Sequence, residues 1–159
     1  MIKKILCAGV VAASAAFLVP QASAQTVSPA GPFTLSNVGT ISVSKGITLS
    51  CGLTGGGNVT SGGAATVTSL NLTGGLCGSI VFSGTPYTIS STSTSSITIN
   101  GVVVTAITGN CAGNLTGSFN QATGEITFAN AMLPSTSGGS ACRITGKVKT
   151  TPALSFTIP

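Results

Sequence analysis

Apolar and polar residues alternate along most of the chain beyond residue 24. From Ile41 to Leu53 the apolar residues fall at odd positions, and Ser or Thr fills most of the even ones. Near the C-terminus, the apolar residues from Leu154 to Ile158 alternate with Ser and Thr in the same way. A period of two is typical of a β-strand that is buried on one face. The pattern therefore predicts β-strands in both regions.

Turn residues divide the alternating segments. Asn100-Gly101 lies between two apolar runs and predicts a tight type I′ hairpin, because both positions favour positive φ angles. A second hairpin is predicted at Gln121–Gly124, between strands at 117–120 and 125–129. The Ser/Thr run Ser90–Ser96 and the triplet Gly55–Gly57 are interpreted as loops between strands.

No amphipathic pattern with the helical period follows the N-terminal segment. About ten short strands separated by Gly, Ser and Thr turns are typical of an antiparallel sandwich or barrel. We therefore expect an all-β fold, an antiparallel β-sandwich or barrel-like domain, that occupies residues 25–159 as one domain.

The first 24 residues have the organisation of a cleaved signal peptide. A basic start with Lys3 and Lys4 precedes an apolar run, and small residues follow it up to Ala24. The apolar run, residues 5–18, is shorter than the ~20 residues that a helix needs to cross a bilayer. We expect cleavage between Ala24 and Gln25, which leaves a secreted bacterial protein, extracellular or at the cell surface, without a transmembrane anchor.

The composition excludes most catalytic chemistry. The sequence contains no His and one acidic residue, Glu125, while Gly (22), Ser (21) and Thr (24) dominate it. A general acid and base, a serine triad and a carboxylate metal site each need side chains that are absent. We therefore expect a protein that is not an enzyme and that has no cofactor or metal site.

Three of the few positive charges lie close together. Arg143, Lys147 and Lys149 occupy one face of a predicted strand, and the remaining cation after residue 25 is Lys45. This row is a candidate patch for an anionic surface or polymer. The alternative is a solvated edge strand whose charges prevent aggregation. The charges are too few for the basic stripe of a nucleic-acid-binding protein.

The predicted outer surface is rich in Ser, Thr and Gly and poor in charge. Such strands repel one another weakly, so they favour self-association or adsorption at interfaces. Thr34–Val43 and Ala153–Ile158 are the candidate exposed strands for assembly. The alternative is that many exported bacterial β-proteins simply have this composition.

Four cysteines follow the signal peptide: Cys51, Cys77, Cys111 and Cys142. The chain has none of the close pairs that zinc sites use, so an even number in an exported chain predicts two disulfides. Sequence alone allows three pairings. We favour Cys51–Cys77 with Cys111–Cys142, because each half has a strand leading into its first cysteine. A crossed pairing stays open.

Several short motifs together resemble a known family. They follow the signal segment in this order: Phe33-Thr34, Lys45 to Cys51, Leu76-Cys77-Gly78, Thr85-Pro86-Tyr87, Ile99 to Val102, Cys111, Cys142 to Gly146 and Pro152-Ala153-Leu154. Over essentially the whole mature chain, this pattern resembles the secreted bacterial activators of alkane oxidation, the PraB family. Tyr87 stands where the family pattern has a Trp.

The resemblance implies a non-enzymatic extracellular protein that helps cells use hydrocarbons by emulsifying or contacting oil. It also implies a link to biofilms and adhesion, and it brings no catalytic residues. Two functions are therefore expected as alternatives. One is an interfacial protein at a hydrocarbon or cell surface, and the other is a biofilm matrix, adhesin or fibre-forming subunit.

Overall fold

The computed structural model describes residues 25–159. The predicted signal peptide, including Ala24 of the predicted cleavage site, lies outside this range. Within it the chain forms eleven β-strands and one short 3-10 helix, η1 (Gly75–Ser79). The strands are β1 (Thr26–Ser28), β2 (Gly31–Lys45), β3 (Ile47–Val59), β4 (Ala65–Thr73), β5 (Val81–Ser83), β6 (Tyr87–Ser90), β7 (Ser96–Thr105), β8 (Cys111–Asn120), β9 (Glu125–Leu133), β10 (Cys142–Thr151) and β11 (Ser155–Thr157). The predicted all-β fold is therefore confirmed.

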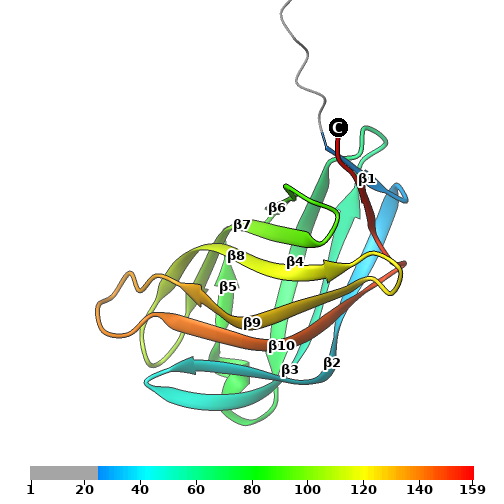
Figure 1. Ribbon diagram of the computed structural model, residues 1–159. Helices are drawn as coiled ribbons and strands as arrows, with labels where there is room; N and C mark the ends of the chain where they lie inside the picture. The colour runs from blue at the N-terminus through cyan, green and yellow to red at the C-terminus, as the bar shows by residue number, and fades with distance from the viewer. Residues whose placement is uncertain (1–24) are drawn as a thin grey trace, which may run out of the picture.

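Eight of the strands close into an antiparallel barrel (Figure 1). The order around it is β7-β6-β4-β3-β2-β10-β9-β8, and a ladder between β7 and β8 closes the ring. Each strand of the ring therefore pairs with its neighbours along the chain, apart from the β10–β2 pair, which joins the last strand of the ring to the first, and the β4–β6 pair, which passes over the extra strand β5. Of the two predicted architectures, the barrel is the one that forms. Closure also removes the free strand edges that a sandwich would leave.

The alternation of the sequence decides which side chains fill the barrel. Ile41 and Leu53 are buried, as are Ile97, Val102 and Ile126 on other strands. Their neighbours in sequence are mostly Ser, Thr and Gly, which face water. The one-residue turn at Gly46 preserves the odd-position register from β2 into β3. For this reason, the alternation continues through two strands without a break.

One predicted hairpin is correct and the other is wrong. Asn120 pairs with Glu125 across the turn that joins β8 to β9, where Gly124 has a φ of 70°. Asn100-Gly101, in contrast, lies inside the continuous strand β7. Gly101 has the same φ of 70° and accompanies a register shift against β8. A glycine with positive φ serves a β-bulge as well as a turn, so the dipeptide bends the strand without reversing it.

The glycine triplet 55–57 is also part of a strand and not a loop. It lies in β3, with Gly57 against the ring of Phe33 on β2. A β-carbon on Gly57 would lie 2.2 Å from Phe33 Cζ and 2.3 Å from the carbonyl oxygen of Thr66. The missing side chain allows an aromatic ring to lie across the backbone. The Ser/Thr run is correctly predicted as a connection, since residues 91–95 join β6 to β7.

Beside β5, the wall of the barrel has a break in its ladders. The β4–β6 ladder ends at Val67 and Tyr87, and β4 forms no ladder with β5, which pairs only with β7. Helix η1 connects β4 to β5 at this point, and the disulfide Cys51–Cys77 ties it to β3. The wall beside β5 is therefore held by a covalent link where backbone pairing stops.

The two ends of the barrel differ. We call the closed end the one that carries β1, β11 and the β8–β9 turn, where both described chain ends lie (Figure 1). There Leu154 is fully buried, and the rings of Phe119 and Phe156 meet edge to face with centroids 5.1 Å apart. We call the opposite end the open end. It carries the β2–β3 turn, η1 and the loops 106–110 and 134–141.

Candidate functional site: an apolar lumen and its mouth

Unfilled apolar space remains inside the barrel. An inner cavity of about 40 Å³ is lined by thirteen residues, all of them apolar, including Leu53, Leu115 and Phe128. An outer cavity of about 50 Å³ lies toward the open end. Both cavities are lined by Val43, Leu72, Phe82 and Ile144. We call the two cavities together the lumen.

The outer cavity reaches the surface at the open end. Its lining includes Ile47 and Ile107, and the Ile107 side chain is 69 % exposed. Lys45 and Arg143 line the same cavity and are its only charged residues. We call these four residues the mouth. The lumen is therefore apolar inside and carries positive charge only where it meets water.

Exposed hydrophobic side chains gather around the same end. Among residues 25–159, six large hydrophobic side chains are exposed. Five belong to elements of the open end: Ile47, Leu76, Val81, Ile107 and Met132. The sixth, Val38, lies on β2 in register with Lys147, away from that end. Apolar groups clustered in this way mark a contact surface more often than scattered ones do.

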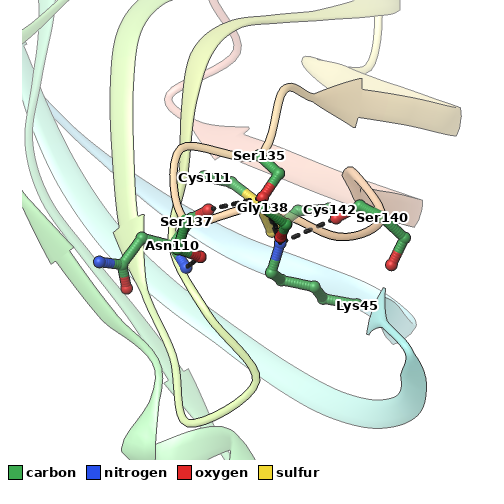
Figure 2. The surroundings of a disulfide bond; sticks show 8 residues. All are labelled: Lys45, Asn110, Cys111, Ser135, Ser137, Gly138, Ser140 and Cys142. Carbon is green, nitrogen blue, oxygen red and sulfur yellow. Dashed lines mark hydrogen bonds between the residues drawn. A yellow bond between two sulfur atoms is a disulfide. The ribbon is translucent and has the colours of Figure 1, made fainter.

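Lys45 is a buried part of the open end. This structural role was not identified from the sequence. Lys45 is only 8 % exposed, since it occupies an inward position of β2. Figure 2 shows its side chain directed at the β9–β10 loop. Nζ donates hydrogen bonds to Ser135 Oγ (2.7 Å) and to the carbonyl oxygens of Gly138 (3.2 Å) and Ser140 (2.8 Å). The ammonium thus ties the β2–β3 turn to the loop across the mouth.

The neighbouring loop 106–110 must leave room for this lysine. Gly109 has a φ of 115°, and a β-carbon there would lie 2.6 Å from Lys45 Cε. It would also lie 2.5 Å from Ser137 Oγ. A larger residue at this position would displace either the lysine stem or the loop. The odd position of Lys45 in the alternating pattern was the one signal in the sequence that could have placed it inside.

Two disulfides join the elements of the open end. Cys51 of β3 bonds to Cys77 of η1, with the α-carbons 5.8 Å apart. Cys111 of β8 bonds to Cys142 of β10, with the α-carbons 6.1 Å apart. The pairing favoured from the sequence is the one in the structure.

The predicted cationic row lies on the outer surface of β10. Arg143, Lys147 and Lys149 are all exposed. Because β10 pairs with both β2 and β9, the explanation as an edge strand is wrong. Lys149 stands opposite Glu125 toward the closed end, whereas Arg143 lies at the mouth. The three residues share the outward face of the strand, and their role as a patch for an anionic surface stays a prediction.

The predicted assembly strand Thr34–Val43 has no free edge. It belongs to β2, which pairs with β3 on one side and β10 on the other. Edge-to-edge association through this segment would require the barrel to open. The other predicted segment contains β11, which pairs only with β1.

Residues 25–159 include no helix with the length and hydrophobicity that crossing a bilayer requires. In the same part of the chain, no three His, Cys, Asp or Glu side chains are gathered as metal ligands would be.

Together, the fold and the site define a small disulfide-bonded β-barrel with an apolar interior that opens at one end. The chain belongs to the family of PraA/PraB-like alkane oxidation protein activators, which it matches over residues 1–158. The family is described as an activator and not as an enzyme. No curated protein and no solved structure matches the chain.

Proposed function

We propose that this protein promotes alkane use without catalysing a reaction, by contacting hydrocarbon at an oil–water or cell–oil interface through its open end. The observation that carries the proposal is the gathering of five exposed hydrophobic side chains around the mouth of an apolar lumen. Each of them gains free energy when it leaves water for oil. The family description supplies the link to alkanes.

Two further features support action outside the cytoplasm. Both disulfides need an oxidising compartment to persist, which favours export. A closed barrel with two covalent bridges also resists the unfolding that interfaces promote. We infer that the mature protein begins near Gln25 and works as a secreted or surface-associated single domain.

The test replaces the side chains of the open end. We expect the triple variant Ile47→Ser, Leu76→Ser and Ile107→Ser to lower oil–water tension far less than the unmodified protein. Each side chain contributes about 1 kcal/mol to adsorption, so on the order of a hundredfold more protein is needed for the same effect. Pendant-drop tensiometry on hexadecane measures this directly.

The matched control is Val38→Ser, which removes the exposed hydrophobic side chain that lies away from the open end. Its tension curve should follow that of the unmodified protein. If the triple variant were as surface-active as the control, the open end would not be the contact surface and the proposal would fail.

A further inference from the structure

The lumen is unusual for the interior of so small a protein. Protein interiors are close-packed, with few voids larger than a water molecule. Here two neighbouring cavities of about 50 and 40 Å³ lie inside the barrel and share four lining residues. An empty apolar cavity lowers stability, because its lining loses contacts that packing would supply. A molecule that fills this space would restore those contacts.

Water is a poor occupant of the inner part. A buried water molecule needs two to four polar partners, and the thirteen side chains around the inner cavity provide none. Among residues 25–159, no buried side-chain nitrogen or oxygen lacks a hydrogen-bond partner. The inner cavity therefore offers contacts only to an apolar molecule.

The dimensions favour a narrow molecule. Ile47 lines the outer cavity and Leu53 the inner one, and six steps along β3 correspond to ~20 Å of strand. Strands in such barrels tilt by ~35–45°, which leaves a depth of ~15 Å along the axis. By volume, each cavity holds roughly three to five groups of the size of a water molecule. A linear chain fits these limits better than a fused ring.

From these observations we infer that the lumen is a binding site for one linear aliphatic chain, which enters through the mouth between Ile47 and Ile107. Any polar end of the chain stays at the mouth, where Lys45 and Arg143 lie. This goes beyond contact with an oil surface, because it gives a single dissolved chain a site inside the molecule.

The first experiment is a calorimetric titration of the full oxidised protein with 1-alkanols of increasing length. We expect saturable binding of one alkanol per protein. Affinity should rise about fourfold for each added methylene group and level off once the chain is longer than the lumen. Binding that does not saturate, or that shows no dependence on chain length, would overturn the inference.

Three ligands of equal length, octane, 1-octanol and octanoate, distinguish which chemical class of aliphatic ligand the lumen binds. Saturable binding of any of them supports the site and identifies whether a hydrocarbon, an alcohol or a carboxylate is preferred. Tighter binding of octanoate that weakens with added salt would assign its head group to the cations of the mouth. If none of the three bound, the lumen would not be a ligand site.

A lumen-filling variant and a matched control locate the binding. Val43 lines both cavities, and Val43→Phe should reduce 1-octanol affinity at least tenfold while leaving the circular dichroism spectrum unchanged. Val38→Phe makes the same change on the same strand at an exposed position and should bind normally. Ile144→Phe, opposite Val43 on β10, is the second filling variant in case the first does not fold. A folded filling variant with normal affinity contradicts the proposal.

Tensiometry on the same proteins separates this inference from the proposed function. Val43→Phe retains the exposed side chains of the open end, so it should still lower oil–water tension. Lowered tension without saturable chain binding would overturn only the lumen site. Saturable chain binding without any fall in tension would support the lumen site and contradict the interfacial function.

Discussion

Tyr87 of β6 links the extra strand β5 to β7 of the barrel through its hydroxyl group. It is the only tyrosine in the sequence, and its side chain is 1 % exposed. Its hydroxyl donates hydrogen bonds to the carbonyl oxygens of Ser83 (2.6 Å) and Val103 (3.3 Å). These contacts lie beside the place where β4 stops pairing with β6. An aromatic residue with a hydrogen-bonding group thus fastens the wall next to its break.

The ionisation of Tyr87 should report this burial. Burial raises the pKa of its phenol above the ordinary value of 10.0. The unfolded chain therefore releases the proton at a lower pH than the folded one. The contribution of the neutral phenol to the free energy of unfolding should consequently be fully present below pH ~10. It should be lost as the pH rises further. The ultraviolet absorbance of tyrosinate measures the titration without interference from other tyrosines.

Tyr87→Phe supplies the control for this titration. Lysines contribute equally to both proteins, so the difference between the two stability curves isolates the phenol. The variant should lack the additional loss of stability at high pH. A titration midpoint at or below 10 in the folded protein would show that the phenol is not held in its neutral form.

At the level of elements, close approach of β2, β3 and β4 depends on Gly57. Its missing side chain lets the Phe33 ring and the Thr66 carbonyl group lie against the β3 backbone. Gly57→Ala should lower the free energy of unfolding by about 1–3 kcal/mol, because the new methyl group overpacks this contact. Urea unfolding measures the difference.

Gly56 provides the comparison within the same strand. A β-carbon there would lie 3.5 Å from Ser69 Oγ and 3.6 Å from the Phe33 carbonyl oxygen, which are ordinary contacts. Gly56→Ala should therefore be neutral or stabilise by a few tenths of a kcal/mol up to about 1. Equal destabilisation by both substitutions would contradict the role given to Gly57.

Glycines show how far the elements could be predicted from the sequence. Alternation identified the strands and their buried faces, because it depends only on neighbours along the chain. Gly101 and Gly124 have the same φ of 70°, yet one bends a strand and the other ends it. What distinguishes them is the partner strand, β8 for Gly101, whose position depends on contacts distant in sequence. The glycine triplet was misinterpreted for the same reason.

The lumen could not be predicted from the sequence. The apolar residues that line it follow the same alternation as those that pack solidly at the closed end. Whether they meet or leave a space depends on the number of strands in the ring and on their tilt. Ile107 lies in a connection between strands, where no pattern marked it as part of the mouth, and Leu76 of η1 had no pattern to mark it as an exposed residue of the open end.

At the scale of the whole molecule, the two disulfides add to the stability that the packed core provides. The cysteine partners are 26 and 31 residues apart, so each bridge should contribute about 3–4 kcal/mol by restricting the unfolded chain. The paired variants Cys51→Ala with Cys77→Ala, and Cys111→Ala with Cys142→Ala, should each lose an amount of this size in urea unfolding.

The position of the bridges predicts where the loss appears. Amide hydrogen exchange should increase most at η1 in the first paired variant and in the loop 134–141 in the second. The β1–β11 pair should keep its protection in both, since it lies at the closed end. A uniform increase along the barrel would mean that the bridges act only on global stability.

The pairing of β1 with β11 also determines how the molecule is presented when it is attached to something else. Both ends of the described chain leave the barrel at the closed end, beside each other (Figure 1). A purification tag, a solid support or a fused domain joined to either end therefore tethers the protein by its closed end. The tethered barrel then points its mouth away from the support, and the orientation is the same whichever end carries the link.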